Sequence, residues 1–192
     1  MMTRSSLLSL AAILMVIGGL FSSVQAQDWE PEERLIVPIP DDWAPAGTDT
    51  PPTGRLTVYL SAINPGEDQI GVQRFYGIAD QVPSDVATRM LQGLPETCAP
   101  EDADLATPPA RNGRPLAIAS IVCRPQTEDG GETGLIEVSR ALVLSGDQDL
   151  HMVTRVWQGP EGAEDDPTGG DGAASAWTRF FDSITYCGAD GC

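Results

Sequence analysis

Three consecutive apolar runs and one amphipathic run in the last third of the chain constrain its fold most strongly. The apolar runs cover Leu116–Arg124, Leu135–Leu144 and Leu150–Trp157. Their alternation of apolar and polar residues is typical of strands. The amphipathic run, Ala173–Tyr186, carries apolar residues at helical spacing: Trp177, Phe180, Phe181 and Ile184. We therefore predict a three-stranded antiparallel meander whose apolar face is covered by a closing helix.

The first half of the chain predicts three further strands and one helix. The expected strands are Arg34–Pro40, Arg55–Ala62 and Gln69–Tyr76, and the segments Ala44–Gly54 and Cys98–Arg114 are expected as Pro- and Gly-containing loops. The helix is expected to begin after Ser84 as its N-cap and to end at Gly93. This order, β-β-β-α-β-β-β-α, predicts an α+β fold: a mostly antiparallel six-stranded sheet packed by helices, in a single domain over residues 34–192.

The first 26 residues have the pattern of a signal peptide. Arg4 supplies a positive start, Leu7–Phe21 is apolar but short for a membrane span, and Val24-Gln25-Ala26 offers a cleavage site after Ala26. Residues 27–33 are acidic and are predicted to be mobile. We therefore expect a periplasmic or secreted protein with no membrane attachment after cleavage.

The chain is strongly acidic. It carries 28 Asp and Glu residues against 11 Arg and no Lys, for a formal net charge of −17. Loss of Arg4 with the leader would make the charge −18. Such a charge repels nucleic acid and favours a cationic partner. Solubility in a saline medium is the alternative explanation.

Four cysteines in an exported chain indicate disulfides. The spacing contains no Cys-x-x-Cys pair, which argues against zinc or a redox motif. Of the three ways to pair four cysteines, we favour Cys98–Cys123 and Cys187–Cys192, but the other pairings stay open.

Several features resemble the PsbP-like superfamily over residues 34–186. They are the turn from Pro40 to Trp43, a helix before the meander, Arg140 in the strand that follows, and the Trp177-x-x-Phe180-Phe181-x-x-Ile184 helix. The superfamily includes an extrinsic photosystem II subunit, a Ran-binding nuclear import factor and small exported bacterial proteins. The resemblance implies a binding or accessory role. Because the chain lacks the Lys-rich surface of the photosynthetic members, it does not imply their partner.

Two groups of residues were considered for chemistry. His151, the one histidine, lies in an expected strand, and no Gly-x-Ser-x-Gly motif accompanies it. The acidic loop 161–171 offers carboxylates of the kind that bind calcium, but without the spacing of an EF-hand. We therefore predict no cofactor, no metal site and no catalytic residue.

The arginines of the meander suggest a binding surface. Arg124, Arg140 and Arg155 come from three successive strands and could line one side of the sheet with His151 and Trp157, where carboxylates such as Glu137 could meet them. Cross-strand ion pairs are the alternative explanation.

Together these observations predict an exported, non-catalytic binding or accessory protein of the bacterial envelope that contacts another protein. The contact would use the exposed side of the sheet or the Cys98–Arg114 loop. One alternative is a cation-assisted hydrolase that uses the 161–171 loop and His151. Another is an acidic inhibitor of a cationic enzyme such as a lysozyme.

Overall fold

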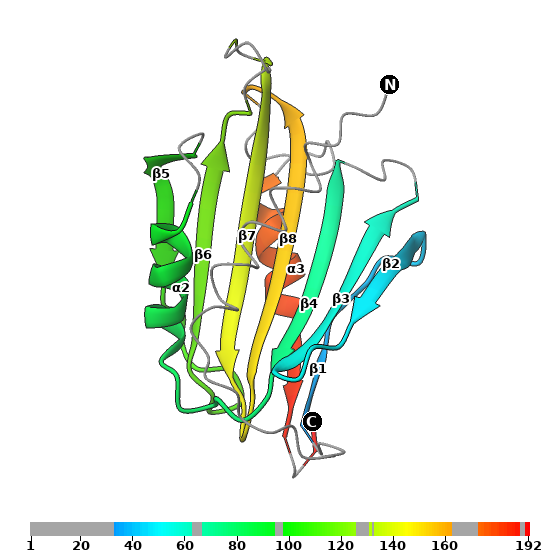
Figure 1. The fold of residues 1–192 in the computed structure, drawn as a ribbon, viewed down its shortest axis with the longest axis vertical. Coiled ribbons are helices and arrows are strands. Elements are labelled where there is room, and N and C mark those ends of the chain that lie inside the picture. Colours follow the sequence, from blue (N-terminus) through cyan, green and yellow to red (C-terminus); the bar gives the residue numbers. More distant parts are fainter. Residues whose placement is uncertain are drawn as a thin grey trace.

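A twisted antiparallel sheet with one helix on each face forms the body of the molecule (Figure 1). The computed structural model describes residues 33–62, 67–94, 98–125, 131, 133–162, 173–188 and 191–192. Its elements are β1 (Arg34–Ile36), β2 (Trp43–Asp49), β3 (Gly54–Ser61), β4 (Asp68–Phe75), α2 (Pro83–Gln92), β5 (Cys98–Ala106), β6 (Leu116–Cys123), β7 (Leu135–Ser145), β8 (Leu150–Pro160), α3 (Ala173–Ser183) and β9 (Thr185–Cys187). The main sheet has seven strands in the order β2-β3-β4-β8-β7-β6-β5, and β1 and β9 form a second, two-stranded sheet.

The predicted α+β fold with a mostly antiparallel sheet is confirmed, but the number of strands is wrong. Two segments expected as loops form most or all of the edge strands of the main sheet: β2 begins at Trp43, one residue before the first of these segments, and β5 lies within the second. Both sequences are rich in Ala, Pro, Gly or Asp, which lowers the strand signal. Each edge strand pairs with one neighbour only, and each contains a register shift, so weak strand-formers are tolerated there.

The first and last described strands pair with each other. β1 was expected in the main sheet, but Leu35 is instead opposite Tyr186 in β9. The predicted closing helix is correspondingly shorter than expected, because α3 ends at Ser183 and its last residues form β9. The spacing of the apolar residues could not distinguish the end of a helix from a three-residue strand, because both continue the same buried side.

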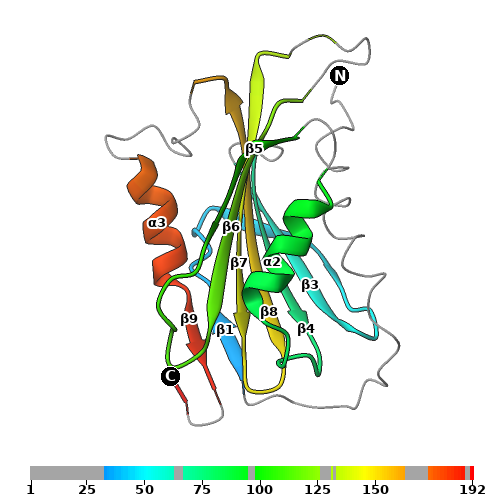
Figure 2. The same ribbon diagram turned by 90° about the vertical axis from the view of Figure 1, so that its left-hand side faces the viewer.

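The helix α3 covers one face of the main sheet. Figure 2 shows α3 and α2 on opposite sides of the sheet. Trp177 is fully buried and packs with Phe181 in a stacked pair, with ring centroids 6.4 Å apart. Beneath α3 lie the inward residues of the four central strands: Ile70, Leu116, Ile136, Val138, Leu142, Leu144 and Val153. This is the larger core, and it matches the predicted position of the closing helix.

The helix α2 covers part of the opposite face. Its buried residues Val86, Ala87 and Met90 pack on small and medium side chains of the sheet, which are Phe75, Ala117, Ala119, Ala141, Val143, Leu150 and Met152. The helix begins at Pro83 after Val82, not at the predicted Ser84 cap, and no side chain caps it. Proline replaces a cap well because it fixes φ and has no N–H to satisfy.

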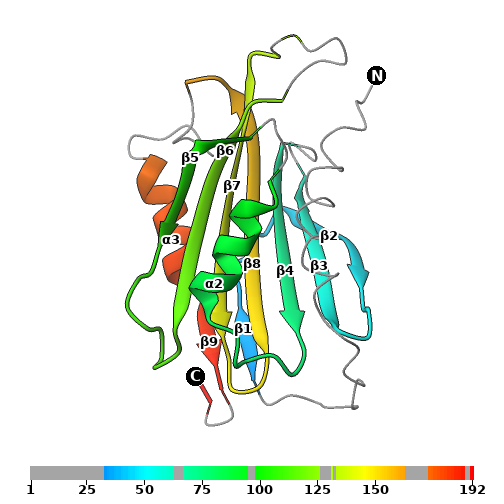
Figure 3. The same ribbon diagram turned by 60° about the vertical axis from the view of Figure 1, so that its left-hand side comes forward.

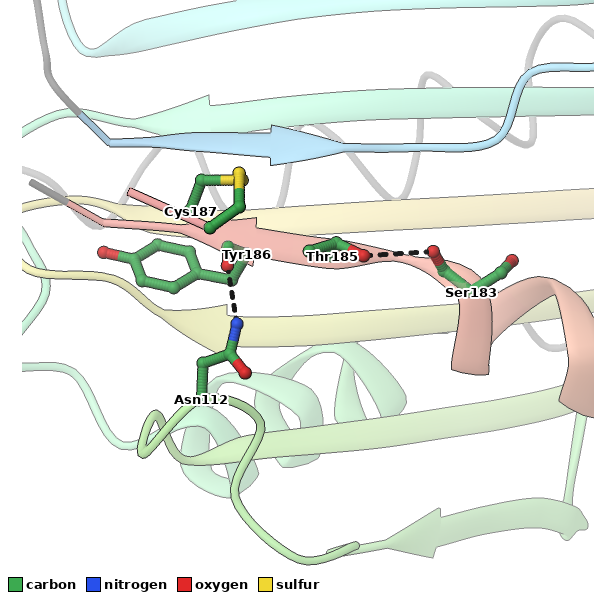
Figure 4. The surroundings of a disulfide bond; sticks show 6 residues. Asn112, Ser183, Thr185, Tyr186 and Cys187 are labelled. Atoms are coloured by element: carbon green, nitrogen blue, oxygen red, sulfur yellow. Dashed lines mark hydrogen bonds between the residues drawn. A yellow bond between two sulfur atoms is a disulfide. The ribbon is translucent and has the colours of Figure 1, made fainter. Parts of the chain in front are cut away.

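Both cysteine pairs are disulfides, in the pairing that the sequence favours: Cys98–Cys123 and Cys187–Cys192. The first joins β5 and β6 at directly opposed positions. The second closes the C-terminal end next to β9 (Figure 4). In the same region the amide nitrogen of Asn112 donates a 2.9 Å hydrogen bond to the carbonyl oxygen of Tyr186. The end of β9 is therefore held covalently and by the turn before β6.

Candidate functional site

Two of the predicted surface arginines lie beneath α3, Arg155 buried and Arg140 half-buried. Arg140 and Arg155 are directly opposite each other on β7 and β8, as predicted for one side of the sheet. That side is the one that α3 covers, and both guanidinium groups lie over the Trp177 ring, 5.0 and 5.2 Å from its centroid. They are therefore cation–π partners of the helix.

Arg155 also forms an ion pair with Asp68. Its Nε and Nη2 atoms lie 3.0 and 2.5 Å from the two carboxylate oxygens. Both side chains are buried, and burial raises the pKa of Asp68 although Arg155 acts to lower it. The rings of Trp43 and Phe180 complete the surroundings of the guanidinium group. Arg155 is thus fully engaged.

The remaining members of the predicted arginine surface are separated from one another. Arg124 is 48% exposed and forms a 3.6 Å ion pair with Glu161 at the end of the sheet. Trp157 is half-buried and packs against the core beneath α3. Glu137 does not meet Arg140, because the two residues are three positions apart along β7 and their side chains therefore point to opposite faces. The arginines, His151 and Trp157 do not form a common exposed surface.

The last member, His151, is in a buried polar cluster with Glu33. Its Nε2 atom lies 3.8 Å from Glu33 Oε1, and both side chains are 3% exposed. Glu33 Oε1 accepts a 2.8 Å hydrogen bond from the backbone N–H of Asp149, and Oε2 accepts bonds from the N–H groups of Asp147 and Gln148. The carboxylate therefore binds three N–H groups of the β7–β8 turn.

The same cluster connects β9 and β4 to this turn. The Tyr186 hydroxyl donates a 2.8 Å hydrogen bond to Glu33 Oε2. Arg74 forms an ion pair with Asp149 and lies 3.6 Å from Glu33. Burial alone would raise the pKa of Glu33, but interactions with His151, Tyr186 and the turn outweigh it and lower the pKa to about 2.

These contacts identify the cluster as a clamp. Of residues 27–33, which were predicted to be mobile, only Glu33 is described, and it makes the contacts given above. A lone glutamate gives no sequence signal of its distant partners. We refer to Glu33, His151 and Tyr186 with the turn 145–149 as the Glu33 clamp. His151 is buried in this cluster, with 3% of its side chain exposed.

The predicted signal peptide, residues 27–32, and positions 163–171 of the acidic loop lie outside the described residues. Of the loop, Glu161 and Gly162 are described, and Glu161 is engaged with Arg124. Within the described ranges, no group of three or more His, Cys, Asp or Glu side chains could hold a metal ion.

A second region on the α2 side of the sheet has a different character. Figure 3 shows α2 in front of the central strands, while β3 and β2 extend beyond it. The residues there, which we call the β3–β8 face, are Leu56, Val58 and Leu60 of β3, Gln69, Gly71 and Gln73 of β4, Glu137 and Ser139 of β7, and Thr154, Val156 and Gln158 of β8. Strand register places them on one side, since directly opposed residues share a face.

The apolar residues of the β3–β8 face pack outside the described cores. Leu56, Val58 and Leu60 are half-buried, and none of them belongs to a hydrophobic cluster of the described residues. The described cluster under α2 contains no residue of β3, whereas Tyr59 of β3, on the other face, packs against the cluster beneath α3. An apolar row at this position is a feature of binding surfaces.

The polar residues of this face contain unused hydrogen-bonding capacity. Gln69 is 4% exposed, and its Oε1 atom, like that of Gln73, has no hydrogen-bond partner in the described structure. Glu137 is 6% exposed, and burial raises its pKa to about 7. Buried polar groups are normally paired, so unpaired ones together indicate a surface suited to a ligand.

The sequence contained part of this signal. The predicted third strand placed Ile70 and Val72 inward, which assigns Gln69 and Gln73 to the other side. A polar side of a strand is usually solvated, so the pattern gave no reason to single it out. The position of α2, whose described cluster does not extend to β3, is not readable from the periodicity.

No protein-family model and no curated protein matches the chain. Among solved structures, it is similar to the crystal structure of LpqN, a protein involved in cell envelope biogenesis of Mycobacterium tuberculosis. The two are 13% identical, with a TM-score of 0.48, over 86% of this chain and 89% of that chain. This similarity is too low to support an argument about function, and the PsbP-like resemblance stays a prediction.

The covalent structure fits folding outside the cytoplasm. Two disulfides are typical of proteins from oxidising compartments. Neither α2 nor α3, the helices of the described part of the chain, has the length and composition of a membrane-spanning segment.

Proposed function

We propose that this chain is an exported, non-catalytic binding protein of the bacterial envelope that recognises another protein through the β3–β8 face. The signal-peptide pattern, the two disulfides and the acidic composition support export to the periplasm or beyond. The burial of His151 in the Glu33 clamp supports a role other than hydrolysis.

One observation carries the proposal. The β3–β8 face combines a row of apolar side chains with amide oxygens that lack partners, at Gln69 and Gln73. Protein interfaces have this composition, with apolar centres and a small number of directed hydrogen bonds. A partner segment lying along β3 could bury the leucines and Val58 and donate N–H groups to the glutamines.

Charge favours a basic partner. The chain carries a formal net charge of −17, and exposed acids lie close to this face. Asp49 is opposite Leu56 on the neighbouring edge strand, and Glu67 immediately precedes β4. A basic rim around an apolar segment would match both properties, and the association rate would fall as salt rises.

Site-specific photo-crosslinking in intact cells tests this function. A photo-reactive amino acid at Val58 should give a discrete crosslinked product with an envelope protein. The same amino acid at Asp182, which is 66% exposed on α3, provides the control. Products from both positions in equal amount, or from neither, would contradict the proposal.

A pair of matched substitutions tests whether the apolar row is needed. Val58→Asp should abolish the crosslink from a neighbouring probe at Leu60. Val82→Asp makes the same chemical change at an exposed apolar residue on the end of α2 and should leave the crosslink unchanged. Partner binding that persists in Val58→Asp would exclude this face as the binding surface.

The inhibitor hypothesis is a variant with a defined partner. If the cationic partner is an enzyme such as a lysozyme, wild-type protein should inhibit it in a salt-sensitive way. Val58→Asp should lose that inhibition, while Val82→Asp should retain it. Crosslinking to a protein without such activity would favour the accessory role.

A further inference from the structure

We propose that Glu137 is a recognition subsite for one cationic side chain, an arginine or lysine of the bound partner. The inference rests on the proposed function, because it assigns partner chemistry to the same β3–β8 face. It arises from the surroundings of this carboxylate, which differ from those of the other described buried acids.

Those other acids all have partners. Asp68 is paired with Arg155, and Asp149 is paired with Arg74 and the N–H of Gly77. Glu33 binds three backbone N–H groups. No described residue gives Glu137 a hydrogen bond or an ion pair. A buried carboxylate without compensation is unfavourable, and natural proteins retain one mainly where it has a function.

The described strand neighbours of Glu137 on its own face are uncharged. The strand register places Cys123 of β6 on one side of it and Gln158 of β8 on the other. Along its own strand, Leu135 and Ser139 are the next residues that point the same way. Cys123 is in a disulfide and does not titrate.

Among the described residues, no cation is positioned to neutralise the carboxylate. Arg140 and Arg155 lie on the α3 side of the sheet, and Arg124 is directed to Glu161. The missing positive charge would therefore come from a ligand. Gln158 and Ser139 beside it offer oxygen acceptors for the additional N–H groups of a guanidinium or ammonium.

A metal ion fits the position less well. Calcium and magnesium sites use several oxygen ligands and usually more than one carboxylate. Among the described residues, Glu137 is not part of a metal-binding group of acidic or histidine side chains. A single carboxylate flanked by neutral acceptors corresponds better to one organic cation.

Cation binding at this site should depend on pH. Burial raises the pKa of Glu137 to about 7, so the carboxylate is mostly protonated at pH 6 and mostly ionised at pH 8. Only the ionised form attracts a cation. Because the ionised fraction increases about tenfold over this interval, the affinity should increase by about the same factor.

A small probe tests the subsite independently of the unidentified partner. Hexylguanidinium and neutral hexylurea are titrated into the purified protein, and the amide resonances of Gln158 and Ser139 are followed by NMR. Hexylguanidinium should shift both resonances. The affinity obtained from these shifts should be about tenfold higher at pH 8 than at pH 6. Hexylurea should bind at least about tenfold more weakly, because it lacks the charge.

Two variants complete the experiment. Glu137→Gln should lose the response to hexylguanidinium and its pH dependence, while Glu161→Gln, which removes an exposed carboxylate at the same end of the sheet, should retain both. Unchanged binding to Glu137→Gln, or a Glu137 carboxyl that titrates near pH 4.5, would overturn the proposal. Crosslinking from Val58 that persists in Glu137→Gln would leave the proposed function intact and remove only this subsite.

Discussion

Arg155 and Asp68 form a bidentate ion pair beneath α3, with nitrogen–oxygen distances of 3.0 and 2.5 Å. The pair connects β8 to the start of β4, where Ile70 is opposite Arg155. Trp177 lies over the same guanidinium group. Such a pair adds little net stability. Loss of one partner, however, leaves the other as a buried charge without a counter-charge, which is strongly destabilising.

Asp68→Asn should therefore destabilise the protein by about 3 kcal/mol at neutral pH. The urea midpoint of unfolding measures this effect. Glu161→Gln, which breaks the exposed pair with Arg124, should cost less than about 1 kcal/mol. Equal effects of the two substitutions would contradict the structural difference between the pairs.

Replacing Glu33 should lower the free energy of unfolding at neutral pH. It should also make that free energy depend less on pH in the acid range. The pKa of Glu33 is lowered to about 2 in the folded protein, below the ordinary value of 4.5. Because the folded-state pKa lies below the pKa in the unfolded chain, ionisation of Glu33 stabilises the folded protein by about 3 kcal/mol at pH values above 4.5. This stabilisation is lost as the pH falls from 4.5 to 2. Unfolding free energies of wild type and Glu33→Gln between pH 2 and 7 should converge at the acid end. A constant difference would show that ionisation of Glu33 is unimportant.

Gly146→Ala should disturb the Glu33 clamp from the other side. A Cβ atom at Gly146 would lie 2.5 Å from Glu33 Oε2 and 3.0 Å from the carbonyl oxygen of Asp149. The carboxylate would have to move, at a cost of about 2 kcal/mol. Gly47→Ala is the control, because nothing lies within 4 Å of its Cβ position. In the double variant Gly146→Ala/Glu33→Gln the two effects should not add.

Glu137→Gln should increase stability at high pH only. Because the pKa of Glu137 is raised to about 7, the folded state holds a proton that the unfolded chain has lost. Stability therefore falls as pH rises from 4.5 to 7 and stays reduced above 7. The variant should gain about 1–2 kcal/mol over wild type at pH 8 and nothing at pH 5, after the cost of an unpaired amide. Thermal unfolding at both pH values measures the difference, and an equal gain at both would argue against titration of this residue.

The two disulfides should contribute unequally. Cys98–Cys123 spans 25 residues and Cys187–Cys192 spans five. In the chain-entropy model the longer loop is worth about 3.5 kcal/mol and the shorter about 2 kcal/mol. Double Cys→Ser variants of each pair, compared by urea unfolding, should show this order. A larger loss at the C-terminal pair would mean that it supports β9 enthalpically.

The strongly periodic segments were predictable from the sequence. Leu135–Leu144 and Leu150–Trp157 form adjacent strands because their alternation fits one buried face, and Trp177 with Phe181 marks the helix above them. The strands β2 and β5 were not predictable, because they exist through pairing with a single neighbour despite unfavourable composition.

The candidate site was less predictable than the fold. Arg140 and Arg155 were correctly placed on one side, but the sequence does not say which face α3 covers. The clamp joins residues more than a hundred positions apart, such as Glu33 and Asp149, and no local pattern reports such a contact. Glu137 was assigned to the arginines although its spacing of three positions from Arg140 along one strand places the two side chains on opposite faces.

The pairing of β1 with β9 has a consequence for biogenesis. If the chain leaves the cytoplasm N-terminus first, β1 is the first described strand to emerge and its hydrogen-bonding partner is the last. Glu33 and Leu35 therefore stay exposed to solvent until Tyr186 has also crossed the membrane. Assembly of this small sheet therefore cannot be completed on a partly translocated polypeptide, and the main sheet could form while β1 still lacks its hydrogen-bonding partner.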